Sequence, residues 1–556
     1  MPYMDGWFRT GDEMLVFGKL ASQKPRAMDH PETERVEAGD DAPVHMDRIV
    51  PIYPLTEGLP QRWLRSLAWS IVHAHAPSVP EPAYTVENLP TRAAAFGHLH
   101  FPDELDDSER ARQRLALDEF VDFQADLRRR RMAVQSRARA TACAGHGRWS
   151  KQLLASLPFK LTGAQQRVLG EIQRDLAASV PMRRLLHGDV GSGKTVVAAA
   201  AITTVAECGR HTLLMAPTEI LADQHARLLR TWLEPLGITV ALRTRHHHDS
   251  TESGFASRGP ILVVGTHALL EESFQLPEVG LVIIDEQHKF GVEQRNRLLR
   301  KGACPHLLVM TATPIPRTLA LTLYGDLDVS VIDHLPGGRG AVRTHVRAAD
   351  RLPRVMDFIR AELQRGRQAY VVYPRVGEES EEATPADVKG VEREAGRLER
   401  AFAPHRVGML HGRMSAEEKE RIMQSFRTGA LSVLLATTVV EVGVDVPNAT
   451  VMLVENAECF GLTQLHQLRG RIGRGPHAAH FILLSDQKTP AVLERMAVLT
   501  RTQDGFEVAE ADLRLRGPGD LLGQNQSGMP PFRFGDLSRD LSLIDRARAI
   551  ASKLRA

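Results

Sequence analysis

Short runs of apolar residues recur along two stretches of the chain, and they predict buried β-strands. Within residues 158–340 these runs are 213–215, 261–264, 281–284 and 307–310. Residues 341–490 repeat the pattern with runs at 369–372, 433–435, 451–454 and 481–484. Continuous apolar strands that alternate with helix-like sequence are typical of parallel sheets covered on both faces. The fold class is therefore α/β, with two lobes of similar size and a cleft between them.

The flanking sequence predicts three further parts. Residues 1–46 contain one short β-like run at 14–17, followed by proline and acidic turns. Residues 47–157 form a mostly helical linker, and residues 491–556 form a C-terminal helical hairpin with further helices. With the lobes at 158–340 and 341–490, the chain has five predicted parts.

Composition and charge restrict the class of protein. The chain has 556 residues, 43% of them apolar and 25% charged, which is ordinary for globular domains. Its formal net charge is only +2, so nucleic-acid binding would depend on local basic patches. The four cysteines include no CxxC pair, which favours a reducing compartment. Without a signal-peptide pattern or an apolar run of membrane-spanning length, the sequence predicts a soluble, cytoplasmic protein.

A glycine-rich turn, GDVGSGKT at residues 188–195, lies between an apolar strand and a helix. This is the setting of a P-loop, whose backbone N–H groups surround phosphate oxygens. We expect Lys194 to contact the β- and γ-phosphates of ATP and Thr195 to ligate Mg²⁺. The other expected nucleotide contacts in this turn are Gly188, Gly191, Ser192 and Gly193. The alternative is a strand–helix turn that binds nothing.

Two carboxylates, Asp285 and Glu286, end the apolar run LVII. Asp285 would hold Mg²⁺ through water, and Glu286 would orient or deprotonate the attacking water. Upstream of the P-loop, the amide of Gln165 could bind the edge of adenine. The alternative there is a helix N-cap at Thr162, and both can hold together.

The second lobe carries QLRGRIGRG at residues 467–475. Arg471 and Arg474 are three residues apart, so on a helix they share one face, with Gln467 one turn earlier. Their expected task is to neutralise charge on the transferred phosphoryl group. Gly443 and Asp445 follow another buried strand and are candidates for linking the nucleotide to nucleic acid. The alternative is that this arginine pair forms only a solvent-exposed basic face, which is the usual role of such a pair in isolation.

Loops at the predicted strand ends carry hydroxyl and amide groups but few aromatic side chains. Thr218, Thr266 and His267 are the candidates for nucleic-acid contact. This chemistry suits binding to phosphates without base recognition. Taken singly, each loop is more simply a turn.

Four sequence blocks resemble superfamily 2 helicases and, more narrowly, the RecG family of bacterial branch-migrating DNA helicases. They are RLLHGDVGSGKT, DEQHKFGVEQR, MTATPIPRTLALTLYGDLD and DGFEVAEADLRLRGPGDLLGQNQSG. The resemblance implies an ATP- and Mg²⁺-dependent motor on stalled forks and Holliday junctions, in recombination and repair. It also implies a monomer that binds branched or duplex DNA, with single-strand-binding protein as a further partner.

The tail block resembles the family's translocation motif, a helical hairpin with a loop. By this resemblance its DNA-contacting candidates are Arg514, Arg516, Gln524 and Gln526. The alternative is a hairpin that only caps a domain.

The family has an N-terminal wedge, an OB-type barrel, and residues 1–46 resemble only its closing part. The chain could be a fragment, could have a misassigned start, or could be a short member with a partial wedge. Two other functions stay open: a duplex translocase coupled to a protein such as RNA polymerase, and a truncated DNA-binding protein without productive unwinding.

Overall fold

The computed structural model places the chain in two compact units. One unit combines Met1–Leu127 with Met529–Ala556, and the other is Arg128–Gly528. The structure describes residues 11–23, 26–36, 44–137, 140–246, 259–286, 290–312, 327–334, 336, 340–374, 385–412, 414–437, 446–516 and 532–554.

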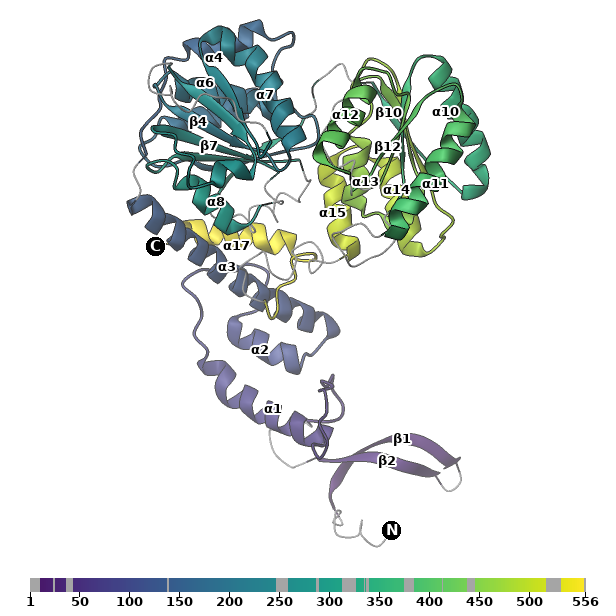
Figure 1. The fold of residues 1–556 in the computed structure, drawn as a ribbon. Helices are drawn as coiled ribbons and strands as arrows, with labels where there is room; N and C mark the ends of the chain where they lie inside the picture. The colour runs from purple at the N-terminus through teal and green to yellow at the C-terminus, as the bar shows by residue number, and fades with distance from the viewer. Residues whose placement is uncertain are drawn as a thin grey trace. The chain divides into compact units, whose positions relative to one another are not determined.

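The larger unit holds two parallel sheets (Figure 1). The first has seven strands in the order β5-β6-β4-β7-β8-β3-β9. Its strands are β3 (Arg183–Gly188), β4 (His211–Met215), β5 (Thr239–Arg243), β6 (Ile261–Gly265), β7 (Val279–Asp285), β8 (His306–Thr311) and β9 (Asp328–Ile332). The accompanying helices are α4 (Arg148–Ser156), α5 (Gly163–Leu176), α6 (Lys194–Ala206), α7 (Glu219–Leu233) and α8 (Val292–Leu299).

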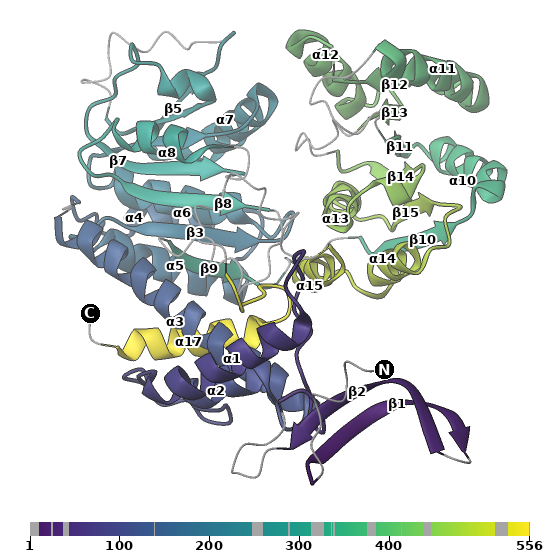
Figure 2. The ribbon, with the colours of Figure 1, turned by 90° about the horizontal axis from the view of Figure 1, so that it is seen from below.

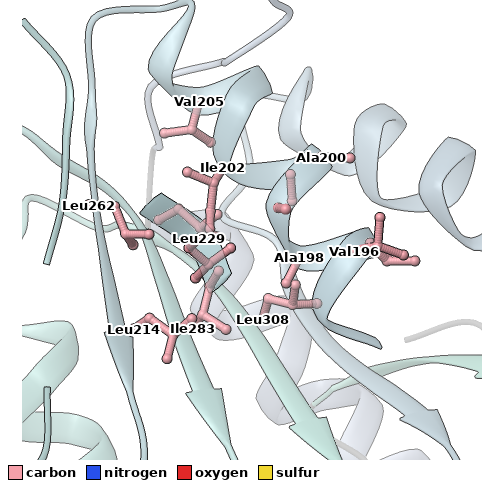
Figure 3. Close-up of a cluster of buried hydrophobic side chains, with 14 of the residues drawn as sticks. Val196, Ala198, Ala200, Ile202, Val205, Leu214, Leu229, Leu262, Ile283 and Leu308 are labelled. Carbon is pink, nitrogen blue, oxygen red and sulfur yellow. The ribbon is translucent and has the colours of Figure 1, made fainter. Parts of the chain in front are cut away.

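Helix α6 is buried almost all round because its middle consists of small and β-branched residues. Alanines at 198–201 let the helix approach the sheet closely, and Ile202 reaches into the same core. Figure 3 shows Ala198 and Ile202 beside Leu214, Ile283 and Leu308, with Leu229 of α7 in the same cluster. This packing holds the N-terminus of α6 at the end of strand β3.

The second sheet has six parallel strands in the order β10-β15-β14-β11-β13-β12 (Figure 2). They are β10 (Val342–Arg347), β11 (Gln368–Val372), β12 (Val407–Leu410), β13 (Val433–Ala436), β14 (Ala449–Val454) and β15 (Ala479–Leu484). The helices of this region are α10 (Leu352–Gln364), α11 (Pro385–Phe402), α12 (Ala416–Arg427), α13 (Leu462–Arg469), α14 (Pro490–Arg501) and α15 (Gly505–Arg516). The predicted α/β class with two parallel-sheet lobes is confirmed, and all eight apolar runs lie within strands.

The smaller unit opens with an antiparallel hairpin, β1 (Glu13–Gln23) and β2 (Arg26–Val36). The expectation of one short strand followed by turns is wrong, because the pairing runs through the proline-containing segment. The strand register shifts where Pro31 faces Gly18, so the residue without an N–H sits at an irregularity of the ladder. That this hairpin belongs to an OB-type barrel stays a prediction.

Helices form the rest of the smaller unit: α1 (Gln61–His75), α2 (Arg92–His100), most of α3 (Leu105–Arg137) and α17 (Leu541–Lys553). The C-terminal segment folds onto α3, where the carboxylate of Glu119 accepts backbone N–H groups from residues 533–535. Arg112 on α3 forms two 2.8 Å hydrogen bonds to Asp540. Among the helices in the described ranges, none is long and apolar enough to cross a membrane.

Candidate nucleotide and nucleic-acid sites

The predicted P-loop connects β3 to α6 and has the backbone geometry that its glycines allow. Gly191 and Gly193 have φ angles of 72° and 87°, in the left-handed region that other residues rarely adopt. A Cβ atom at Gly193 would collide with the amide of Gln165, and one at Gly188 would crowd the hydroxyl of Ser192. The turn is therefore narrow and lined by backbone.

Two polar groups in the turn suit a phosphate. The Ser192 hydroxyl is buried, and within the part of the chain that the structure describes it has no hydrogen-bond partner. The Lys194 ammonium donates to the carbonyls of Gly188 at 2.8 Å and Asp189 at 2.9 Å. An unsatisfied buried hydroxyl and a buried cation beside helix-end N–H groups fit a nucleotide's phosphates.

Charged residues of both lobes influence the pKa of Lys194. Burial lowers the pKa of Lys194, and the charge of Arg474 acts in the same direction. Glu286, Asp285 and Asp189 oppose this shift. The P-loop lysine, both predicted catalytic carboxylates and one predicted arginine thus share one electrostatic environment.

Gln165 holds the P-loop from helix α5. Its side-chain oxygen accepts from the backbone N–H of Thr162 at 2.8 Å, and the Thr162 hydroxyl caps the helix in return. Its amide nitrogen donates to the Ser192 carbonyl at 2.8 Å. The N-cap is thus observed, whereas adenine recognition by Gln165 stays a prediction.

Asp285 ends β7 and has a partner that the sequence did not reveal. Nε2 of His225, on α7, lies 2.8 Å from Asp285 Oδ2. Burial acts to raise the pKa of Asp285, but the hydrogen bond from His225 and the charge of Lys194 hold it below its usual value. The carboxylate is therefore ionised at neutral pH and suited to a metal ion. The prediction missed His225 because only the adjacency of β4 and β7 brings α7 beside this strand end.

Glu286 follows in a left-handed conformation with φ of 51°. Its carboxylate accepts from the backbone N–H of Ala312 at 3.3 Å, just after β8. The predicted catalytic carboxylate thus contacts the TATP segment at the neighbouring strand end.

In the second lobe the arginines do not lie on a helix, so the predicted shared helical face is wrong. Helix α13 contains Gln467 but ends at Arg469, and the chain turns at Gly470 and Gly473. Arg471 and Arg474 lie within and beyond this turn, and Arg474 Nε donates to the Gly470 carbonyl at 3.1 Å. Gly470 caps the helix because glycine stabilises a helix poorly, and Gly473 takes a positive φ of 71° in the turn that follows.

Thr195 lies in the first turn of α6, which follows the carboxyl end of β3, and Asp285 lies at the carboxyl end of β7 in the same parallel sheet. Within the described ranges, no group of three or more histidine, cysteine or acidic side chains could enclose a metal ion. Mg²⁺ is commonly held by one or two protein oxygens together with substrate phosphates, and Thr195 and Asp285 fit that mode.

The nucleic-acid candidates occupy strand ends as predicted, with differing exposure. Thr218 caps α7, and the backbone N–H of Thr266 donates to the Arg243 carbonyl. His267 is exposed beside Phe290.

Helix α15 carries exposed Arg514 and ends at Arg516. The remaining predicted site residues lie outside the described residues: Gly443, Asp445, Gln524 and Gln526.

Sequence reasoning also missed a buried contact between the lobes. Nε2 of His466 on α13 lies 2.7 Å from Asp189 Oδ1 of the P-loop. Only tertiary packing brings these residues, 277 positions apart, together.

Three family models match the chain in succession. They are the DEAD/DEAH box helicase over residues 162–322, the helicase conserved C-terminal domain over 351–476, and "ATP-dependent DNA helicase RecG, domain 3, C-terminal" over 502–555.

Curated relatives described as "ATP-dependent DNA helicase RecG" match nearly the whole chain. The protein from Escherichia coli O157:H7 is 44% identical over 98% of this chain and 80% of its own length. The Bacillus subtilis protein is 40% identical over 100% of this chain and 81% of its own length. The Synechocystis protein is 43% identical over 95% of this chain, which spans only 64% of that relative.

A solved structure described as RecG bound to a three-way DNA junction is similar over 98% of this chain and 73% of its own. Its TM-score is 0.69 and its sequence identity 38%. The match extends through both lobes and the tail. The Bacillus subtilis and Escherichia coli relatives are 40% and 44% identical over about four fifths of their own length. The chain therefore belongs to the RecG family of ATP-dependent DNA helicases.

Proposed function

We propose that this chain hydrolyses ATP to move on branched DNA, such as stalled forks and Holliday junctions, in recombination and repair. The proposal is carried by the P-loop at the end of β3 and the carboxylates that follow at the end of β7, whose charges, with that of Arg474 from the second lobe, act on Lys194. The three-way junction bound by the similar solved structure supports branched DNA as the substrate.

In this proposal the residues divide the work. Backbone N–H groups of Gly191 and Gly193, the Ser192 hydroxyl and Lys194 bind the phosphates of ATP. Thr195 and Asp285 hold Mg²⁺, which neutralises charge on the phosphates. Glu286 accepts the proton of the attacking water. Arg471 and Arg474 stabilise the charge that develops on the phosphoryl group, with Gln467 beside them.

For the DNA path we propose Thr218, Thr266 and His267 in the first lobe. Arg514 and Arg516 would contribute from the tail, together with Gln524 and Gln526. Gly443 and Asp445 would connect this path to the nucleotide. We further propose a monomer that works in the cytoplasm and meets single-strand-binding protein at its DNA substrates.

An ATPase assay on fork, duplex and single-stranded DNA tests the proposal. We expect forks to stimulate turnover most, and Lys194→Ala to lower it by about 100-fold or more, because phosphate stabilisation is lost. Lys151→Ala, at an exposed position on α4 in the same lobe, is the matched control and should keep full activity.

Turnover that ignores DNA would contradict a DNA motor. Equal stimulation by fork and plain duplex would contradict the branched-DNA assignment and favour a duplex translocase coupled to a protein partner.

A further inference from the structure

A buried chain of hydrogen bonds runs from the P-loop to the C-terminal helices. Asp189 Oδ1 lies 2.7 Å from His466 Nε2, and His466 Nδ1 lies 2.8 Å from an Arg469 guanidinium nitrogen. The other terminal nitrogen of Arg469 donates to the carbonyls of Leu499 at 2.9 Å and Thr502 at 2.7 Å. His466 and Arg469 are each only 3% exposed. No motif described above includes these contacts.

The chemistry of the partners fixes the direction of every bond. A guanidinium group can only donate, so Nδ1 of His466 must accept from Arg469. The ring is then neutral, its hydrogen is on Nε2, and it donates to Asp189. Burial acts to raise the pKa of Asp189, but this hydrogen bond from His466 holds it below its usual value. Asp189 is therefore ionised and accepts from His466.

Close backbone approaches leave little freedom around this chain of bonds. A Cβ atom at Gly470 would lie 2.8 Å from Cβ of Val190 in the P-loop. A Cβ atom at Gly505, the first residue of α15, would lie 2.8 Å from His466 Nε2. The next residue, Phe506, packs edge-on against His187 with ring centroids 4.8 Å apart. Because packed interiors do not deform continuously, movement of the P-loop backbone must be shared by its neighbours.

At the P-loop end of this chain of bonds, the position of Asp189 depends on where the Lys194 ammonium points. Besides accepting from His466, Asp189 accepts from the Val190 N–H at 2.6 Å, and its own carbonyl binds the Lys194 ammonium. Turning of that ammonium toward a phosphate would release the carbonyls of Gly188 and Asp189. The peptide that carries the Asp189 carboxylate could then reorient.

We propose that Asp189, His466 and Arg469 are positioning residues that transmit nucleotide occupancy of the P-loop to α14 and α15. This inference rests on the proposed function, because it presumes that ATP binds at the P-loop. It assigns the link between nucleotide and tail to one hydrogen-bonded path through His466, separate from the arginines that face the phosphates.

Two amide substitutions at His466 differ in whether the bond to Asp189 is kept. In His466→Gln the amide nitrogen can reach the place of Nε2 and donate to Asp189, while the amide oxygen accepts from Arg469, so both bonds are kept. In His466→Asn the shorter side chain keeps an acceptor for Arg469 but cannot reach Asp189. Both variants are polar and similar in size, so they control for each other.

The test measures hydrogen exchange in residues 495–510 with and without a non-hydrolysable ATP analogue, in the full chain and without DNA. We expect nucleotide to change protection there in the wild type and in His466→Gln. In His466→Asn we expect that response to be about tenfold smaller, as for loss of a typical coupling between sites. The ratio of fork-stimulated to DNA-free ATPase should fall in the same variant and return with glutamine.

The proposed path would be contradicted by a wild type that shows no nucleotide response in residues 495–510, or by a full response in His466→Asn. It would also be contradicted if His466→Gln lost the response equally while thermal melting shows that both variants are folded. A wild type that responds to nucleotide but whose ATPase ignores DNA would count against the proposed function alone.

Discussion

At the scale of single residues, burial decides which protonation state a side chain can keep. His306 is 1% exposed, and its Nδ1 accepts from the Met182 N–H at 3.0 Å. Its Nε2 lies 3.1 Å from the Thr141 carbonyl and donates to it. Both bonds require the neutral ring, and burial lowers the pKa of His306.

This lowered pKa predicts a loss of stability in mild acid. Below the unfolded-state pKa of about 6.5 the unfolded chain binds the proton more readily, so stability falls as pH decreases toward the folded-state pKa. We expect the melting temperature to fall between pH 7.5 and 5.5. His306→Gln should cost about 1–3 kcal/mol at pH 7.5 and flatten this dependence.

His246→Gln, at an exposed position of the same lobe, should melt as the wild type does at every pH. A His306→Gln profile parallel to that of the wild type would contradict the assignment of the acid effect to this histidine.

Single residues also show where prediction from sequence reaches its limit. The positions of Lys194 at the end of the P-loop and of Asp285 at the end of a strand could be predicted from their sequence blocks, while their roles and that of Glu286 stay proposals. The partners His225 and His466 could not, because strand order and lobe packing bring them to the site. Local sequence carries no information about such contacts between distant segments.

At the scale of elements, continuous apolar runs correctly identified eight strands of the two sheets, whereas β5, β9, β10 and β12 were not predicted. The identified strands are buried on both faces, so their pattern differs sharply from that of the surrounding helices. Of the β1–β2 hairpin, only part of β1 was predicted and β2 was not. The reason is that β2 is largely polar and the apolar residues of the hairpin are exposed: Val16, Phe17, Leu20 and Met28. The end of α13 at Arg469 was missed because two glycines outweigh the spacing of the arginines.

Helix α7 offers a matched test of how much its buried face contributes. Leu229 is fully buried in the core of the first lobe, whereas its neighbour Leu228 is 37% exposed. Leu229→Ala should destabilise this lobe by about 2–5 kcal/mol, since it removes methyl groups and leaves a cavity. Leu228→Ala should cost less than about 1 kcal/mol.

Urea denaturation followed by hydrogen exchange of strands β4 and β7 would report the stability of this lobe alone. Similar losses in the two variants would contradict the assigned face of α7.

At the scale of the whole molecule, the smaller unit joins two segments separated by the entire larger unit. Arg112 and Asp540 connect them with side chains 17% and 4% exposed. The hydrogen bonds that Arg112 donates to the carboxylates of Asp540 and Glu109 raise the pKa of Arg112, so its charge is permanent. No local pattern predicts this pairing, because its two halves lie more than 400 residues apart.

Breaking this pair should loosen the C-terminal segment. Asp540→Ala removes one of the two carboxylates that pair with the Arg112 guanidinium and leaves Glu109 as the other. The loss should therefore stay below the about 3–5 kcal/mol expected for a fully buried charge without any partner. We expect faster hydrogen exchange and proteolysis within residues 532–554. Ser542→Ala, exposed on α17, is the control. Unchanged exchange in Asp540→Ala would contradict a role for the Arg112–Asp540 pair in holding the segment.

The pairing of α3 with residues 532–554 also has a consequence for synthesis on the ribosome. Phe120 and Phe123 of α3 pack edge-on against Phe532, so these aromatic rings lack their partner while the intervening chain is being translated. Both parallel sheets can assemble during that interval, whereas the smaller unit must wait for the last helix to emerge. A nascent chain stalled before that point would carry two folded lobes and an α3 helix with exposed aromatic side chains. Chaperones bind such exposed apolar surface.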